Sequence, residues 1–168
     1  MREARHRKHS DVRHRKSPER SNPRLRKALG QYLLADRETA ERTAKAVENA
    51  PLVVEIGAGE GALTEALLAR GHRVVGVELD PAMVARLESR FKHRRDFHLI
   101  GEDILKLDWN RFGTEAPEIA VVGNLPYHLT SPILFSVFRQ VRRGRPPRVR
   151  QMIVMVQKGE GKRITATP

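Results

Sequence analysis

A short run of glycines offers the first residues that could bind a ligand. Gly57, Gly59 and Gly61 directly follow an apolar segment rich in β-branched residues, as a loop follows a buried strand. Closely spaced glycines let the backbone approach a ligand there. With Ala62 the segment fits the dinucleotide pattern G-x-G-x-x-A, and Glu78 lies at about the spacing of an acid that binds a ribose. These residues indicate a nucleotide-type cofactor and leave open which one; a tight turn without a ligand is the alternative.

A third acid follows another predicted strand. The segment Gly101-Glu102-Asp103 begins where an apolar run ends at Ile100. Asp103 could accept a hydrogen bond from an adenine amino group. It is equally suited to capping the turn that follows it.

The segment Asn124-Leu125-Pro126-Tyr127 follows a fourth apolar run and is the most specific one. Asn124 offers a side-chain carbonyl, and the Leu125–Pro126 peptide offers a rigid backbone carbonyl. The lone pair of an adenine N6 amine is delocalised into the ring. Two acceptors that bind the hydrogens of this amine would make the lone pair available for attack on a sulfonium methyl group, so that no strong base is needed. Tyr127 could stack a base that has left its helix. The alternative is a Pro-containing turn with a core tyrosine.

Strands and helices alternate around these segments. One predicted helix ends at Gly71, and Asp80 followed by Pro81 is typical of a helix N-cap and first position. Ser131 with Pro132 predicts another helix start. Such alternation predicts an α/β fold with a doubly wound, parallel, Rossmann-like sheet and ligands at the carboxyl ends of the strands. The expected strands are Leu52–Ile56, Arg73–Glu78, Phe97–Ile100, Ile119–Val122 and Gln151–Val156, and the expected helices are Ala62–Arg70, Pro81–Phe91 and Ser131–Val141.

Positive charge gathers in a tail and in one predicted loop. The net charge is +12, with eleven Lys and Arg against three acids between Met1 and Leu29, and six arginines without an acid between Arg139 and Arg150. Basic side chains on a phosphate backbone gain affinity by releasing counterions, so this placement favours a nucleic-acid partner. A solvated tail that only aids solubility is the alternative. The candidate RNA-binding residues are Arg139, Arg142, Arg143 and Arg145.

Length and composition limit the remaining possibilities. With 168 residues, 39% of them hydrophobic, we expect one catalytic domain over residues 25–168, preceded by a disordered basic tail over 1–24. The absence of cysteine excludes disulfides and thiolate metal sites, and we expect no metal site. No apolar run approaches the roughly 20 residues of a spanning helix, so we expect no membrane partner. Trp109 and Phe112 are expected to cover the sheet.

The chain resembles the ribosomal RNA adenine dimethyltransferases, which are related to the macrolide-resistance methyltransferases. The resemblance covers roughly Arg24 to the end and rests on residues 28–34, the glycine loop, the acids at 78 and 103, the N-[LI]-P-Y motif and Gln157-Lys158. It implies a class I methyltransferase fold with S-adenosyl-L-methionine as methyl donor. By resemblance the cofactor-binding residues are Gln31, Leu33, Glu55, Gly57, Gly59, Gly61, Glu78, Leu79, Asp103 and Asn124, and the catalytic residues are Asn124, Leu125, Pro126 and Tyr127.

The sequence departs from the family pattern in three places. Gly30-Gln31-Tyr32-Leu33-Leu34 stands where the family has Gly-Gln-Asn/His-Phe-Leu, a segment that closes over the cofactor. His128 replaces an Asn, and we give it no catalytic role. Family members continue into two more strands and a small helical domain, so we expect a C-terminally truncated catalytic domain.

The resemblance implies methyl transfer to the N6 amine of adenosines in small-subunit ribosomal RNA. We expect a cytoplasmic monomer that acts on an assembly intermediate of the small subunit. The alternatives are a large-subunit methyltransferase of the macrolide-resistance type and a non-catalytic RNA-binding or ribosome-assembly protein. The segment Leu129–Leu134 and the pair Gln157-Lys158 favour the small-subunit branch.

Overall fold

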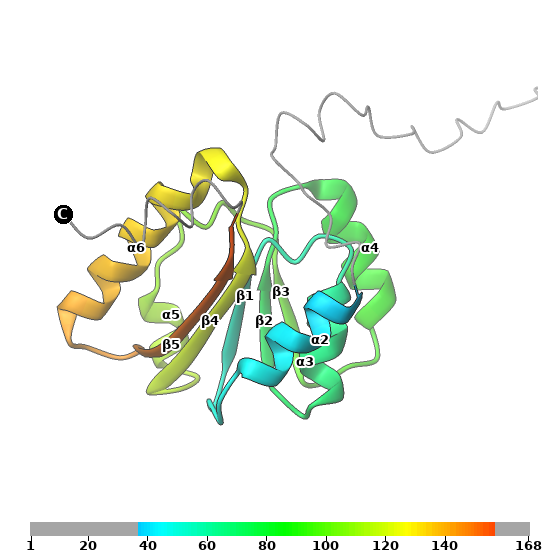
Figure 1. The fold of residues 1–168 in the computed structure, drawn as a ribbon, viewed down its shortest axis with the longest axis horizontal. Coiled ribbons are helices and arrows are strands. Elements are labelled where there is room, and N and C mark those ends of the chain that lie inside the picture. The colour runs from blue at the N-terminus through cyan, green and yellow to red at the C-terminus, as the bar shows by residue number, and fades with distance from the viewer. Residues whose placement is uncertain (1–36, 157–168) are drawn as a thin grey trace, which may run out of the picture.

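The computed structural model describes residues 37–156, which form a parallel sheet with helices on both faces (Figure 1). Within this range no helix is long and apolar enough to cross a membrane. The helices are α2 (Arg37–Ala46), α3 (Ala62–Ala69), α4 (Pro81–Phe91), α5 (Asn110–Gly113) and α6 (Thr130–Arg143), with a 3-10 turn at Tyr127–Leu129, and the strands are β1 (Val53–Ile56), β2 (Val74–Val77), β3 (Phe97–Ile100), β4 (Glu118–Asn124) and β5 (Arg148–Met155).

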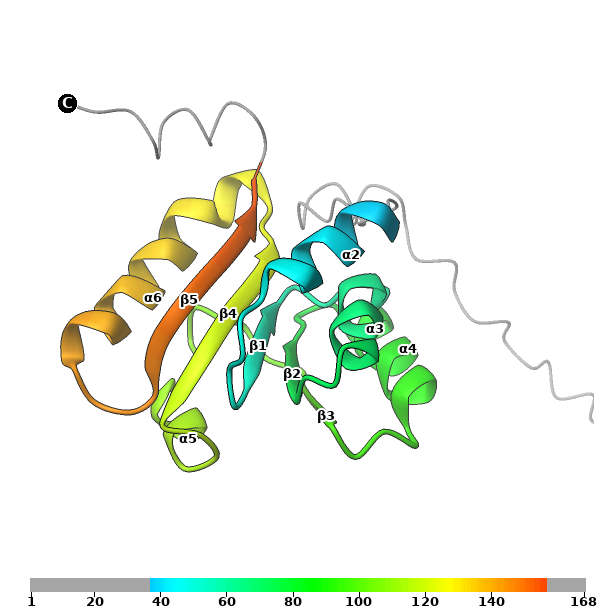
Figure 2. The same ribbon diagram turned by 60° about the horizontal axis from the view of Figure 1, so that its bottom comes forward.

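The strands lie in the order β3-β2-β1-β4-β5, and every neighbouring pair is parallel. Helices α2, α3 and α4 cover one face of the sheet, and α5 and α6 cover the other, as Figures 1 and 2 show. The strand order reverses between β1 and β4, which is the switch point where open α/β sheets bind ligands. The predicted doubly wound sheet is confirmed.

Each face of the sheet has its own hydrophobic core, because successive side chains of a strand point to opposite faces. Val53 of β1 packs with α2 and α3, whereas Val54 packs in the core that contains α5 and α6. Trp109 and Phe112 are buried in this second core, as predicted, and the Trp109 indole N–H donates a hydrogen bond of 3.2 Å to the hydroxyl of Ser136.

The predicted helix start at Asp80 is confirmed, and the one at Ser131 is wrong. The Asp80 side chain accepts a hydrogen bond of 2.8 Å from the N–H of Ala82. Helix α6 instead begins at Thr130, whose hydroxyl donates to the Pro126 carbonyl at 3.0 Å. The preceding 3-10 turn leads the backbone directly into the helix, so Ser131 and Pro132 lie inside its first turn.

Strands β1 and β4 approach each other closely at Gly123, which pairs with Ile56. A Cβ atom built on Gly123 would lie 2.5 Å from the Ile56 carbonyl oxygen and 3.2 Å from the Ile56 Cβ. Only glycine therefore fits this strand position without moving the two strands apart.

We predict that Gly123→Ala lowers the free energy of unfolding by about 1 to 3 kcal/mol, because the added methyl group overpacks the β1–β4 contact. Gly101→Ala is the matched control, since its Cβ would meet only Val84 side-chain atoms at 3.5 and 3.6 Å. Urea unfolding of the three proteins measures the difference. Equal midpoints for the two variants would contradict the prediction.

Candidate functional site

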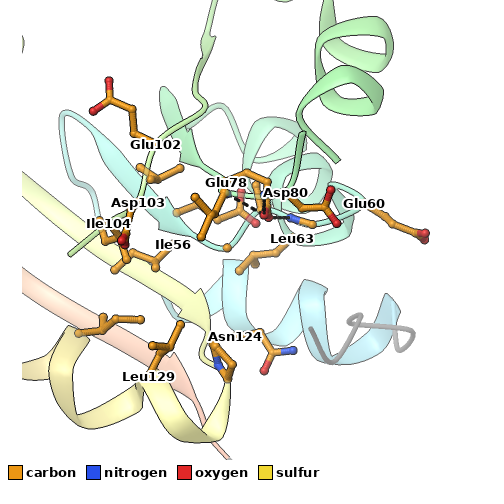
Figure 3. Close-up of a pocket in the computed structure, with 18 of the residues that line it drawn as sticks. Ile56, Glu60, Leu63, Glu78, Asp80, Glu102, Asp103, Ile104, Asn124 and Leu129 are labelled. Carbon is orange, nitrogen blue, oxygen red and sulfur yellow. Dashed lines mark hydrogen bonds between the residues drawn. The ribbon is translucent and has the colours of Figure 1, made fainter. Parts of the chain in front are cut away.

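A large open pocket lies at the carboxyl ends of the strands, across the β1–β4 switch point (Figure 3). Its volume is about 1060 Å³, including space open to solvent. Eight predicted site residues line it: Glu55, Gly57, Gly59, Glu78, Leu79, Asp103, Asn124 and Pro126. The structure therefore brings these eight residues together at one pocket.

The glycine loop needs backbone conformations that side chains rarely adopt. Gly57 and Gly59 have φ angles of 74° and 55°. Both line the pocket, so the backbone itself forms part of the wall. Gly61, with φ 83°, packs against α4 instead, where a Cβ would lie 2.7 Å from Phe91 Cε2 and 3.0 Å from Leu87 Cδ2. Its assignment to the cofactor stays a prediction.

The Glu78 carboxylate ties the loop after β1 to the end of β2. One oxygen, Oε2, accepts a hydrogen bond of 2.8 Å from the N–H of Gly59. The other, Oε1, accepts from the N–H groups of Leu79 and Asp80 at 2.8 and 2.9 Å. These three backbone donors hold the Glu78 side chain at the pocket wall.

Both readings of Asp103 fit the structure. Its side chain accepts a hydrogen bond of 3.0 Å from the N–H of Leu105, which caps the turn after β3. Asp103 also lines the pocket beside Ile104. Figure 3 shows these two residues on the other side of Ile56 from Asp80.

Glu55 is a carboxyl group buried at the base of the pocket, only 1% exposed. Burial raises its pKa from the ordinary 4.5 to about 8. The Thr64 hydroxyl, which donates to Glu55 Oε2 at 2.6 Å, counters part of this rise in pKa, and the nearby charge of Glu78 adds to it.

The segment after β4 forms the opposite wall. Asn124 ends β4 and lies across the pocket from Glu78 in Figure 3. The Pro126 carbonyl accepts hydrogen bonds from the Leu129 N–H and the Thr130 hydroxyl, both at 3.0 Å. The Leu125 side chain is buried in the hydrophobic core. The group of Leu125 that is predicted to act in the site is therefore its backbone carbonyl.

Some predicted residues lie outside what the structure describes. Gln31 and Leu33 precede residue 37, as does the predicted tail over 1–24. The side chains of Tyr127 and Arg143 are also outside the description, although both backbones belong to described elements. These assignments stay predictions.

Sequence reasoning missed part of the lining. Leu129 and Ile133 contribute apolar surface from the start of α6, and their spacing of four residues along a helix was a signal for a shared face. His128, to which sequence reasoning assigned no role, also lines the pocket. The other missed polar residues that line the pocket are Glu60, Asp80 and Glu102.

The lining is strongly acidic. Six carboxyl groups and His128 are its titratable side chains, and Lys and Arg are absent among the described residues that line it. Such a lining attracts a cationic ligand and opposes a pyrophosphate, because like charges repel strongly near a low-dielectric wall. Within residues 37–156 no group of three or more His, Asp or Glu side chains is arranged to hold a metal ion.

The prediction of a single basic loop over 139–150 is wrong. Arg139 and Arg142 are exposed on α6, and Arg145 is exposed in the connection to β5. Arg148 and Arg150 belong to β5, and Arg150 forms an ion pair of 3.2 Å with Glu118. The arginines therefore spread over a helix, a connection and a strand.

Comparison with known proteins decides the family. The ribosomal RNA adenine dimethylase family matches residues 22–168. The chain belongs to this family. Ribosomal RNA small subunit methyltransferase A from Synechococcus elongatus is 38% identical over 149 residues, which cover 85% of this chain and 53% of that protein. The enzyme of that name from Anaeromyxobacter sp. (strain K) is 40% identical over 161 residues, covering 89% and 54%.

Solved structures agree with the family fold. A 23S rRNA methyltransferase, ErmE, has a TM-score of 0.60 and 27% identity, and covers 76% of this chain and 48% of that chain. A dimethyladenosine transferase from Plasmodium falciparum has a TM-score of 0.59 and 23% identity, and covers 78% of this chain and 44% of that chain. At this identity the likeness supports the fold alone. This member of the dimethylase family spans about half the length of the curated relatives it matches.

We predict that Glu55→Gln removes a pH-dependent destabilisation. Glu55 has a pKa of about 8 in the folded protein and of 4.5 in its ordinary state. The contribution of the bound proton to the free energy of unfolding is therefore complete below pH 4.5 and is lost as the pH rises through 8. At about 1.4 kcal/mol per pH unit, wild type should lose on the order of 4 kcal/mol relative to the variant. Denaturant unfolding of both proteins between pH 5 and 9 measures this; parallel pH profiles would contradict it.

Proposed function

We propose that the chain transfers methyl groups from S-adenosyl-L-methionine to the N6 amine of adenosines in small-subunit ribosomal RNA. The observation that carries the proposal is that Asn124, from the N-L-P-Y segment, lines the same pocket as the Gly57 loop and Glu78. A ligand bound by the loop and a base held by Asn124 would share this one space. The family membership of the chain supports the same chemistry.

The residues of the pocket fit S-adenosylmethionine. The acidic lining suits a ligand with a sulfonium and an ammonium group, and Glu78 lies where it would meet ribose hydroxyls. Apolar side chains such as Ile104 and Leu129 offer surface for a flat adenine ring. When bound, the cofactor supplies an electrophilic methyl group. A dinucleotide, which fits the glycine pattern equally well, is disfavoured by its pyrophosphate charge.

The chain's own contribution to catalysis is to hold and orient the amine. The Asn124 side-chain carbonyl would accept one N6 hydrogen. The Pro126 carbonyl is already engaged by two donors, which leaves the Leu125 carbonyl as the backbone acceptor of the segment for the second hydrogen. Holding both hydrogens concentrates the lone pair on nitrogen and aligns it for in-line attack, so no general base is required.

The curated relatives favour the small-subunit substrate over the large-subunit alternative. Small-subunit enzymes match at 38 to 40% identity, whereas the 23S methyltransferase structure shares 27%. We extend the proposal to a monomer that acts on a small-subunit assembly intermediate, in the cytoplasm where such particles are built. An RNA-binding protein without turnover is the outcome that would replace it.

We predict that Asn124→Ala lowers methyl transfer on the order of 100-fold or more, because its hydrogen bond acts on the reacting nitrogen. Transfer of a labelled methyl group to small-subunit RNA, or to partly assembled subunits, measures the effect. Calorimetry should show that the variant still binds S-adenosylmethionine, and that neither protein binds NAD. Wild type that binds S-adenosylmethionine and RNA but transfers nothing would favour the non-catalytic alternative.

A second prediction concerns RNA contact by α6. Arg139 and Arg142 share an exposed helix face with Phe135 and Phe138, which suits the phosphates and bases of single-stranded RNA. Replacing both arginines with Ala should reduce the slope of log affinity against log salt by about 1.4 to 1.8.

The control is the pair Arg42→Ala and Lys45→Ala on α2, which removes the same charge from another surface. Filter binding over a salt series compares the two double variants. Equal salt slopes for the two double variants would show that the α6 arginines do not contact RNA.

A further inference from the structure

Two carboxyl groups lie close together in the pocket but have very different surroundings. Glu55 and Glu78 are 1% and 5% exposed, and their charges interact. Two buried carboxylates in one site repel each other, so one of them tends to hold a proton. Burial is the largest cause that raises the pKa of Glu55, the more deeply buried of the two.

The two carboxyl groups also differ in their hydrogen-bond partners. Three backbone N–H groups donate to the Glu78 oxygens. Glu55 is bonded by Thr64 of α3, whose hydroxyl donates to Oε2 at 2.6 Å and whose backbone also forms a hydrogen bond to it. Its neighbours in register on the adjacent strands are Gly76 and Val122, which carry no charge.

Charged groups of the opposite sign are missing around Glu55. Among residues 37–156 no Lys, Arg or His forms an ion pair with it, and the charged group that faces it is Glu78. The other acids of the lining, Glu60, Asp80, Glu102 and Asp103, add negative charge to the same pocket. Burial and the neighbouring acids therefore favour a neutral Glu55 until a cation arrives, and the hydrogen bonds from Thr64 offset only part of this preference.

We propose, building on the cofactor site above, that Glu55 carries a proton in the ligand-free chain and releases it to solvent when S-adenosylmethionine binds. The carboxylate formed at the pocket base then balances positive charge of the ligand. One proton leaves the protein for each cofactor that enters. Cofactor affinity in neutral solution is therefore coupled to pH through Glu55, a positioning group that takes no part in methyl transfer.

The pH dependence has a definite sign. Below the pKa of about 8, binding must remove the Glu55 proton, so affinity should rise up to tenfold for each pH unit and level off above pH 8. The amino group of the cofactor also titrates, near pH 7.7 to 8.0. That contribution is common to all variants, so the ratio of wild-type to variant affinity isolates Glu55.

The test is calorimetric titration of the full chain with S-adenosylmethionine from pH 6 to 9, in phosphate and in Tris. Wild type should release up to one proton more than Glu55→Gln at pH 7, seen as a larger difference in binding enthalpy between the buffers. The affinity of Glu55→Gln relative to wild type should fall about tenfold between pH 6.5 and 7.5. Glu88→Gln, an exposed change on α4, is the matched control and should behave as wild type.

Infrared spectroscopy of the ligand-free wild type tests the proton without any ligand. A protonated carboxyl band should be present at pH 7 and should disappear as the pH rises through about 8. Absence of the band, or equal proton release by wild type and Glu55→Gln, would overturn the inference even if S-adenosylmethionine binds. Presence of the band without cofactor binding would instead contradict the proposed function.

Discussion

The site depends on the three hydrogen bonds from backbone N–H groups to the Glu78 carboxylate. They join the Gly59 loop, which follows β1, to the backbone of Leu79 and Asp80 after β2. The loop needs positive φ angles, which are unfavourable except for glycine, and the carboxylate holds it in that form. The same interaction fixes this acidic side chain at the pocket wall. Loop conformation and ligand preference therefore have one physical origin.

Burial, more than the neighbouring Glu78, sets the state of Glu55. A charge on Glu55 would be buried beside Glu78, and the hydrogen bonds from Thr64 offset only part of that cost. The sequence of β1 thus places a carboxyl group where its charge is costly in the free protein and useful beside a cation. This cost resembles the strain that proteins often keep at functional sites.

The parts of the fold that sequence predicted are those with local signals. The strand at Phe97–Ile100 and the helix after Asp80 were predicted with the bounds that the structure has, because apolar runs and an N-cap mark them. Helix α2 was not predicted, since its buried residues are only Ala40, Thr43 and Ala44 in a segment in which half of the residues are charged. Helix α5 has four residues, too few for a periodic signal.

Within the site, sequence located the residues but not their interactions. Glu78 was expected at a ribose, yet its bonds to the backbone depend on how two loops meet in space. The burial of Glu55 and its contact with Thr64 likewise follow from helix α3 packing on β1, which residue spacing does not encode. The sequence did not distinguish two roles for Asp103, because an aspartate suits both a turn cap and a pocket wall. In the structure Asp103 caps the turn after β3 and also lines the pocket.

The two walls of the pocket come from different parts of the sheet, and this determines what must stay rigid. The cofactor wall is formed by the loops after β1, β2 and β3, whereas the Asn124 wall is formed by β4 and the turn into α6. Their only shared boundary in the sheet is the β1–β4 pairing, where Gly123 lies against Ile56 one residue before Asn124. In-line transfer tolerates little error in the distance between donor and acceptor atoms. In the proposed mechanism, the close backbone contact at Gly123 therefore sets the spacing of the two walls, although Gly123 itself does not line the pocket.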